Sequence, residues 1–281
     1  FVNNTFNAPL MVTGVVANGS GAVHTLRVNA GNEAVVLSNS NIYTGTTFIA
    51  TNALLRITNS NALGAGVNAV VEVSQGGALE IDGSGGAVNV TDKVLRIRAT
   101  GSFGAGFKTM QFGAVRNLAG ANSWTNDDIG DNVVAVGAID LRGENDANDR
   151  QMWIAADGAS SLNIVGQIAG TQNNAGARQG HTLVKTGTGT IRYSGTTANL
   201  NTGQTTIYGG TLELNKTAGV NAIAGGITVG DGGGGAGSDV LRLIQIDQIP
   251  VVTITVAPSG TFDLNGLSDA IGALTLQRGD N

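Results

Sequence analysis

Residues 201–214, NTGQTTIYGGTLEL, contain the pattern that decides the fold of this chain. The last four residues alternate between polar and apolar side chains, and a Gly-Gly pair stands directly before them. An alternation of period two places one face of a short strand in the core and the other in water, whereas paired glycines mark a turn. The stretch therefore predicts a short strand that follows a tight turn.

The same alternation recurs along the whole sequence. It is found at 54–57, 70–73, 78–81, 94–97, 241–243, 252–256 and 261–264, with Asp-Gly, Asn-Gly or Gly-Gly turn signals between many of these segments. No window of about a dozen residues shows the 3.6-residue period of a helix. We therefore expect an all-β chain of many short strands and almost no helix.

Composition supports this expectation and excludes several classes of protein. Glycine accounts for 44 of 281 residues without a three-residue period, and there are only three prolines, so the chain is not collagen-like. A net charge of −5 with four lysines gives no cationic surface for phosphates, and we expect no nucleic-acid partner. The absence of cysteine excludes disulfides, thiolate metal sites and a cysteine nucleophile.

Internal repeats favour a solenoid over a sandwich or a closed barrel. Residues 55–66 match residues 95–106 without a gap, a shift of 40 that suggests two coils of about 20 residues each. A longer repeat relates 24–26 to 181–183 and 77–83 to 260–266, and its shift grows from 157 to 183. This growth predicts one extra coil near 230–250. A solenoid tolerates such an insertion because each coil contacts only its neighbours.

We accordingly interpret residues 1–281 as a single β-solenoid segment, part of a longer chain, with roughly a dozen coils. Repeat copy 1 covers about 14–106, a less regular middle covers 107–165, and repeat copy 2 covers about 166–281. Glycine, asparagine, serine and threonine are expected at the corners, where a positive φ or an added side-chain hydrogen bond is needed.

Two stretches carry a resemblance to a known family. Residues 183–195, LVKTGTGTIRYSG, followed by 201–214, and residues 260–266, GTFDLNG, resemble the passenger-associated β-strand repeat of bacterial autotransporters. The N-terminal copy departs from this pattern, because Arg27-Val28-Asn29-Ala30-Gly31 stands where the Lys-Thr-Gly-Thr-Gly phrase would be.

The resemblance implies a single-stranded right-handed parallel β-helix, displayed as a passenger outside the cell or on the surface of a Gram-negative-type bacterium. It implies a structural or adhesive scaffold that is not an enzyme and needs no cofactor. Membrane contact is expected only through a C-terminal barrel, which the 4% aromatic content does not indicate here. Unless more coils follow, both ends expose strand edges, which predicts either a longer parent chain or head-to-tail self-association into fibres. A glycan or host-surface ligand is a further expected partner.

The two histidines, His24 and His181, occupy the same phase of the long repeat. Two catalytic groups 157 residues apart on a rod would not meet, whereas a structural corner residue recurs naturally. We therefore interpret both as structural and expect no catalytic residue.

An acidic segment in the irregular middle is the main sequence feature that favours an enzyme. Pectin-degrading β-helices place carboxylates or a Ca²⁺ site with a basic residue on one face. The matching residues here are Asn126, Asp127, Asp128 and Asp131, with Arg142, Glu144, Asp146, Asp149 and Arg150 nearby. A solvated loop rich in turn-forming residues explains the same letters, and we favour it over a polysaccharide-acting enzyme.

Three further features each have a structural and a functional interpretation. Residues 234–242 fit one copy of a Ca²⁺-binding nonapeptide with Asp239 as a weak metal candidate, but a flexible corner explains them as well. Arg278-Gly279-Asp280 spells an adhesion tripeptide that also arises by chance. Trp124 and Trp153 are expected to cover a coil, the alternative being an aromatic platform for a glycan-binding module.

Overall fold

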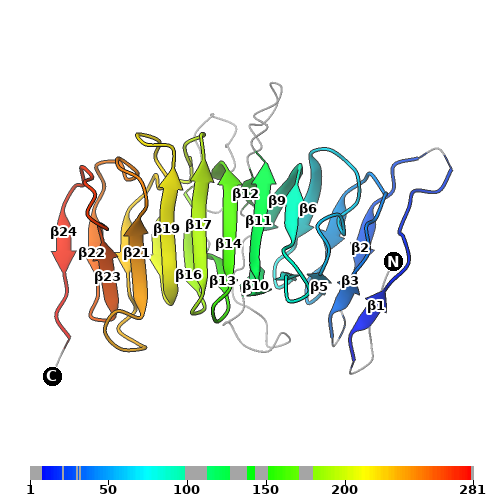
Figure 1. Cartoon of the computed structure of the whole chain (residues 1–281), viewed down its shortest axis with the longest axis horizontal. Coiled ribbons are helices and arrows are strands. Elements are labelled where there is room, and N and C mark those ends of the chain that lie inside the picture. Colours follow the sequence, from blue (N-terminus) through cyan, green and yellow to red (C-terminus); the bar gives the residue numbers. More distant parts are fainter. Residues whose placement is uncertain are drawn as a thin grey trace.

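The computed structural model describes residues 8–20, 22–29, 31, 33–98, 113–126, 138–142, 151–170 and 180–279. Within these ranges the chain forms 24 strands and no helix, as the sequence predicts. The strands stack side by side along the long axis of the molecule, from β1 at one end to β24 at the other (Figure 1).

The strands form three sheets, whose members follow in spatial order. The 11-stranded sheet contains β1 (Leu10–Val12), β3 (Val35–Leu37), β5 (Leu54–Ile57), β7 (Ala78–Asp82), β10 (Val115–Ala119), β13 (Gln151–Ala156), β16 (Thr182–Thr186), β18 (Thr205–Ile207), β20 (Ile227–Val229), β22 (Ile254–Val256) and β24 (Leu274–Leu276). The seven-stranded sheet contains β23 (Gly260–Asp263), β21 (Asp239–Leu243), β19 (Gly210–Lys216), β17 (Thr190–Gly195), β14 (Ser161–Gly166), β11 (Ala121–Asn126) and β8 (Asn89–Thr91). The six-stranded sheet contains β15 (Ile168–Gly170), β12 (Ile139–Arg142), β9 (Lys93–Arg98), β6 (Ala69–Val73), β4 (Thr47–Ile49) and β2 (Leu26–Val28).

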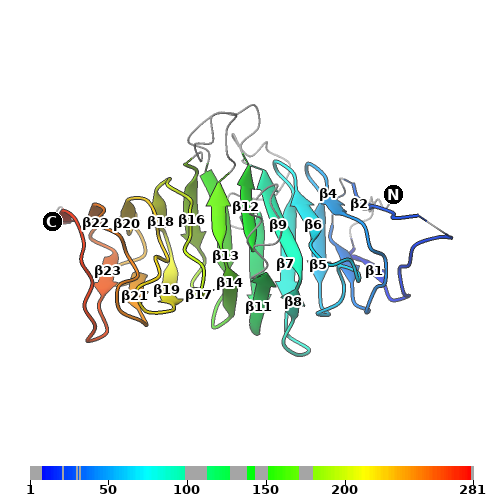
Figure 2. The same cartoon turned by 90° about the horizontal axis from the view of Figure 1, so that it is seen from above.

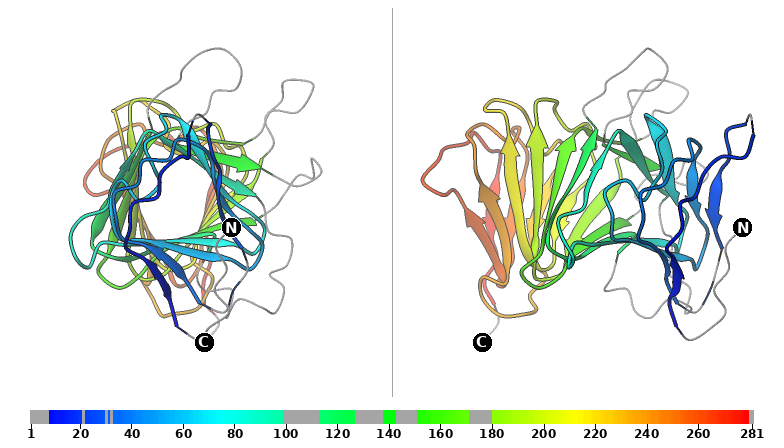
Figure 3. Two further views of the ribbon diagram at one scale, coloured as in Figure 1. Left: turned by 90° about the vertical axis from the view of Figure 1, so that its right-hand side faces the viewer. Right: turned by 45° about the vertical axis from the view of Figure 1, so that its right-hand side comes forward.

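Every pair of neighbouring strands is parallel, and the chain visits the sheets in rotation. We call the chain between one strand of the 11-stranded sheet and the next a circuit. Val35 pairs with Leu55, 20 residues on, whereas Leu79 pairs with Val115, 36 residues on. The longer middle circuits have room for a strand in all three sheets, and the others use two. This arrangement, seen from above in Figure 2 and end-on in the left panel of Figure 3, is compatible with a β-solenoid.

The short alternating segments of the sequence all appear as strands. Residues 54–57 are β5, and residues 78–81 lie within β7. The gap-free match of 55–66 to 95–106, however, does not relate equivalent positions. Leu55 lies in the 11-stranded sheet and Leu95 in the six-stranded sheet. Both sheets bury one face in the same core, so both produce the same alternation, and the shift of 40 is wrong as a measure of two coils.

The longer repeat relates corners that make the same hydrogen bonds to the next circuit. Asn41 donates from its backbone N–H to the carbonyl of Asn61 at 3.0 Å and from Nδ2 to the carbonyl of Ala62 at 2.7 Å. Asn199 makes the same two bonds, at 2.9 Å to Asn221 and 2.6 Å to Ala222.

The two copies of this repeat nevertheless lie on different sides of the stack. Strand β4 in the six-stranded sheet corresponds to β18 in the 11-stranded sheet, and β3 in the 11-stranded sheet corresponds to β17 in the seven-stranded sheet. The second copy is therefore displaced by one sheet around the axis.

Glycines at one corner allow successive circuits to stack closely. A Cβ atom built on Gly203 would lie 2.3 Å from the carbonyl oxygen of His181, and one on Gly225 would lie 2.1 Å from the carbonyl oxygen of Gly203. In the first copy, a Cβ on Gly45 would lie 2.2 Å from the carbonyl oxygen of His24. Any side chain at these positions would overlap the circuit beneath, so the glycines meet a requirement for space.

The core consists of columns of inward side chains in register along the stack. One column of the 11-stranded sheet runs through Ile154, Lys185, Ile207, Val229 and Val256. A second, in the seven-stranded sheet, runs through Val90, Trp124, Ile164, Tyr193, Leu214 and Leu243. All of these residues are buried. Hydrophobic burial repeated at each level accounts for the stability of the stack.

The outer faces carry ladders of alternating charge, one on each sheet. Most neighbouring charges in these ladders form ion pairs between adjacent circuits. Asp140 and Arg142 pair within β12, and Glu213 and Arg242 face each other in the register of β19 and β21. The ladders are Arg56–Glu80–Arg116–Asp157, Glu72–Arg96–Asp140–Arg142 and Arg192–Glu213–Arg242–Asp263. A single exposed ion pair contributes little, but a network in fixed register opposes any slip that would bring like charges together.

The glycine corner yields a stability test. Replacement of Gly203 by alanine should lower the free energy of unfolding by about 1–3 kcal/mol, because the new methyl group overlaps the His181 carbonyl and the circuits must move apart. Thermal unfolding followed by circular dichroism measures the effect. Gly85→Ala is the matched control, since a Cβ there meets no atom within 4 Å. Equal melting temperatures for the two variants would contradict the steric role of the corner.

Candidate functional site

The two histidines stand at equivalent corners, one before β2 and one before β16. His181 is fully buried, and its backbone N–H and carbonyl are both bound by the side-chain amide of Asn201, at 3.0 and 2.7 Å. His24 is exposed, and its backbone N–H donates to Asn18. The glycine packing of both corners fits the structural interpretation.

Most of the acidic segment lies outside the described residues, namely Asp127, Asp128, Asp131, Glu144, Asp146, Asp149 and Arg150. Its two described members have structural roles. Asn126 is buried and donates to the side chain of Asn68 at 3.2 Å. Arg142 pairs with Asp140 at 2.8 Å in the charge ladder of the six-stranded sheet. The adhesion tripeptide likewise reaches outside the described residues at Asp280.

The nonapeptide forms the corner between β20 and β21. Gly234, Gly235 and Gly237 are exposed and have positive φ angles, as a turning chain requires. Asp239, the weak metal candidate, is buried at the start of β21. Within the described residues no group of three or more His, Cys, Asp or Glu side chains is arranged to hold a metal ion.

Asp239 shares its buried corner with Lys185, the lysine of the Lys-Thr-Gly-Thr-Gly phrase. The Lys185 ammonium donates to the carbonyls of Thr186, Gly187 and Gly209, at 2.9, 2.7 and 2.5 Å. It therefore connects the corners of two successive circuits. Burial lowers the pKa of Lys185 to about 7, against the opposing attraction of the Asp239 and Asp157 carboxylates.

The two tryptophans have different environments. Trp124 is 1% exposed and donates from Nε1 to the carbonyl of Lys93 at 3.0 Å, so it belongs to the core as the sequence analysis favoured. Trp153 lies on the outer face of the 11-stranded sheet and is partly exposed. Its ring makes an edge-to-face contact with Tyr208, with centroids 6.2 Å apart.

These two rings stand in a hollow that we call the aromatic groove. It has a volume of about 610 Å³ and is lined by Arg116, Trp153, Asp157, Gly158, Thr186, Gly187, Thr188, Tyr208 and Asp231. The residues come from β10, β13, β16 and the turns after β13, β16, β18 and β20, which are successive strands of the 11-stranded sheet. The groove therefore follows the long axis of the stack.

The charges of the aromatic groove are partly neutralised. Arg116 binds Asp157 through Nε and Nη2, at 2.8 and 2.5 Å, and Glu80 through Nη1 at 3.3 Å. Asp231 is exposed and accepts a hydrogen bond from the backbone of Gly233 at 2.7 Å. Arg56 and Arg116 balance Glu80 and Asp157, and the buried Lys185 lies near Asp239. The exposed Asp231 therefore gives the region around the groove a negative balance.

Among the groove residues the sequence indicates a binding role only for Trp153, whereas residues 186–188 and Tyr208 lie in the stretches that carry the family resemblance. Three other groove residues come from different circuits: Asp157 directly follows β13, Tyr208 directly follows β18, and Asp231 lies two residues after β20. Their spacing in the sequence therefore forms no motif. The register of the 11-stranded sheet brings them together. A sequence signal would have required knowledge of which strands share a sheet.

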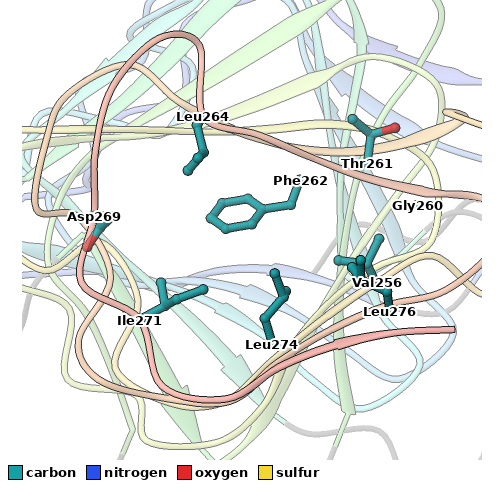
Figure 4. A pocket seen from close by; sticks show the side chains of 9 residues that line it. All are labelled: Val256, Gly260, Thr261, Phe262, Leu264, Asp269, Ile271, Leu274 and Leu276. Carbon is teal, nitrogen blue, oxygen red and sulfur yellow. The ribbon is translucent and has the colours of Figure 1, made fainter.

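A second hollow lies in the last circuit, within the stack. It has a volume of about 410 Å³ and is lined mostly by apolar side chains, among them Val256, Phe262, Leu264, Ile271 and Leu274. Figure 4 shows Phe262 pointing toward the centre of the coil, between Leu264 and Leu274. This hollow continues the apolar core to the end of the described chain.

Comparison with known proteins adds no assignment. No family model, curated protein or solved structure matches the chain. None of the described residues forms a helix long and apolar enough to cross a membrane.

Titration of Lys185 gives a pH-dependent prediction. Its ordinary pKa is about 10.4 in the unfolded chain. Between pH 7 and that value, Lys185 is therefore protonated in the unfolded state and largely deprotonated in the folded state. Stability attributable to this group should therefore rise with pH, by about 2 kcal/mol from pH 7 to 9. The measurement is the free energy of urea unfolding for the wild type and Lys185→Met at both pH values. Parallel pH profiles for the two proteins would contradict the assignment.

Proposed function

We propose that this chain is an extracellular structural and adhesive β-solenoid segment of an autotransporter-type surface protein. In this proposal the coil is a single-stranded right-handed parallel β-helix of roughly a dozen coils, and the segment acts as a stalk or fibre-forming scaffold. It is non-catalytic and uses no cofactor. The proposed location is the outside of a Gram-negative-type bacterium.

The observation that carries the proposal is the continuous parallel pairing of the 11-stranded sheet from one end of the described chain to the other. A stack of this kind holds loops at fixed distances along a rod, and its length grows with each circuit. Ten steps of about 4.8 Å give a rod of about 50 Å. The role of Lys185 at the Thr-Gly-Thr-Gly corner also gives a physical reason for the phrase on which the family resemblance depends.

Self-association is the second part of the proposal. Strand β24 pairs with β22 on one side, and Leu274 and Leu276 are 47% and 72% exposed. An exposed strand edge with apolar side chains beside the hollow of the last circuit is suited to receive a further circuit, either of a longer parent chain or of another copy. Head-to-tail contacts of this type are heterologous and generate filaments.

Surface location can be tested with antibodies. Antibodies raised against the purified chain should label intact cells of the bacterium that produces it, and immunogold electron microscopy would place the label outside the outer membrane. An antibody against a cytoplasmic protein is the control and should bind only after permeabilisation. Label that appears only in permeabilised cells would refute the proposed location.

Self-association can be tested at β24. Leu276→Lys should reduce the average mass of the purified chain toward that of a monomer, because a charge at the edge strand opposes pairing with another copy. Sedimentation velocity at several concentrations measures this mass. Val251→Lys is the matched control, since Val251 is 76% exposed outside the strands. A wild-type chain that stays monomeric at all concentrations would remove this part of the proposal.

A further inference from the structure

We propose that the aromatic groove binds a linear glycan built of neutral or amino-substituted sugars. This site goes beyond the scaffold role and does not depend on it. The inference rests on the exposed aromatic pair, an unsatisfied hydroxyl in the groove, its charge balance and its direction along the stack.

Trp153 is partly exposed and Tyr208 is exposed, whereas the other tryptophan and the other two tyrosines are buried. The chain has two tryptophans and three tyrosines, and Trp124, Tyr43 and Tyr193 are each no more than 2% exposed. Tyr208 is 37% exposed and lies against the partly exposed Trp153. Exposed aromatic rings lose the benefit of burial, whereas the apolar face of a sugar ring can cover them. The pair therefore provides a stacking surface.

A buried hydroxyl beside the rings has no partner. Thr186 is 7% exposed, lines the aromatic groove, and its Oγ1 atom makes no hydrogen bond. Buried hydroxyls normally find a partner, and one left without costs free energy. Oγ1 itself is covered, so a sugar hydroxyl reaches it only when the wall of the groove opens, and it would then offer both a donor and an acceptor to this atom. Thr188, Asp157 and Asp231 supply further polar groups along the same groove.

The charges select among glycans. Arg116 is already bound to Asp157 and Glu80, so it is not available to hold a sulfate or a uronic acid. Asp231 adds an exposed negative charge. A sulfated or acidic chain would be repelled, a neutral chain would be accepted, and an amino sugar would gain an attraction to Asp231.

The direction of the groove favours a linear ligand. Its residues belong to five successive strands of the 11-stranded sheet, from β10 to β20, and four steps of about 4.8 Å give a length of about 19 Å. A site of this length, open along the stack, accommodates several sugar units in a row. A compact ligand would use only part of it.

The test uses three hexasaccharides: N-acetyl chitohexaose, which is neutral, a glucosamine hexamer, which is cationic, and a heparin hexasaccharide, which is polyanionic. Isothermal titration calorimetry measures the affinity of the whole chain for each. We expect saturable binding of the first two and none of the third. Tryptophan fluorescence of the wild type should change on binding, since Trp153 is the solvent-accessible tryptophan.

Variants assign the binding to the groove. Trp153→Ala and Tyr208→Ala should each weaken both complexes about tenfold, which corresponds to about 1.4 kcal/mol. Asp231→Asn should weaken only the glucosamine complex, about threefold. Phe48→Ala is the matched control, because Phe48 is a partly exposed aromatic residue on the outer face of a different sheet. It should leave both affinities unchanged.

Two outcomes would overturn the proposal. The first is no saturable binding of either the neutral or the amino hexamer, or tighter binding of the heparin hexasaccharide. The second is an unchanged affinity in Trp153→Ala and Tyr208→Ala while both variants retain the wild-type melting temperature. Because the assay measures binding to purified protein, its result is independent of where the cell places the chain.

Discussion

The spacing of parallel strands, about 4.8 Å, is the constraint on which the rest of this structure depends. Each circuit must lie directly over the one before, at the corners as well as in the strands. Gly203 and Gly225 leave no room for a side chain, so the backbone itself is the packing surface there. At these corners the choice of glycine is therefore a consequence of stacking rather than of flexibility. Glycine also loses more backbone entropy on folding than other residues do. Burial of the columns in each circuit must offset that cost.

Buried lysines connect different circuits through hydrogen bonds. The three described lysines are all at most 5% exposed, and each donates to main-chain carbonyls of another circuit. Lys216 binds Gly166, the last residue of β14, and Ser194, the second-last residue of β17, in two successive strands of the seven-stranded sheet. Carbonyl oxygens at a corner have no strand partner, so an ammonium group that satisfies several of them compensates for its own loss of water.

The sequence predicts the strands well and the sheets poorly. Period-two alternation located β5, β7 and β21, because burial of one face requires that pattern. The alternation is the same in all three sheets, and for this reason the sequence match aligns Leu55 with Leu95 although the two residues lie in different sheets. The aromatic groove escaped prediction for the same cause. Trp153 and Tyr208 become neighbours only through the pairing of β13, β16 and β18, which no local pattern encodes.

The displacement of the second repeat copy by one sheet has a consequence for how such a chain can diversify. A duplicated segment joins the stack through its strand edges, which are the same on every side, so it can enter at a new angle around the axis. A surface feature carried by the ancestral segment then reappears on a different side of the rod. Duplication thus distributes copies of one feature around the circumference as well as along the length, and each copy is free to change without disturbing the other.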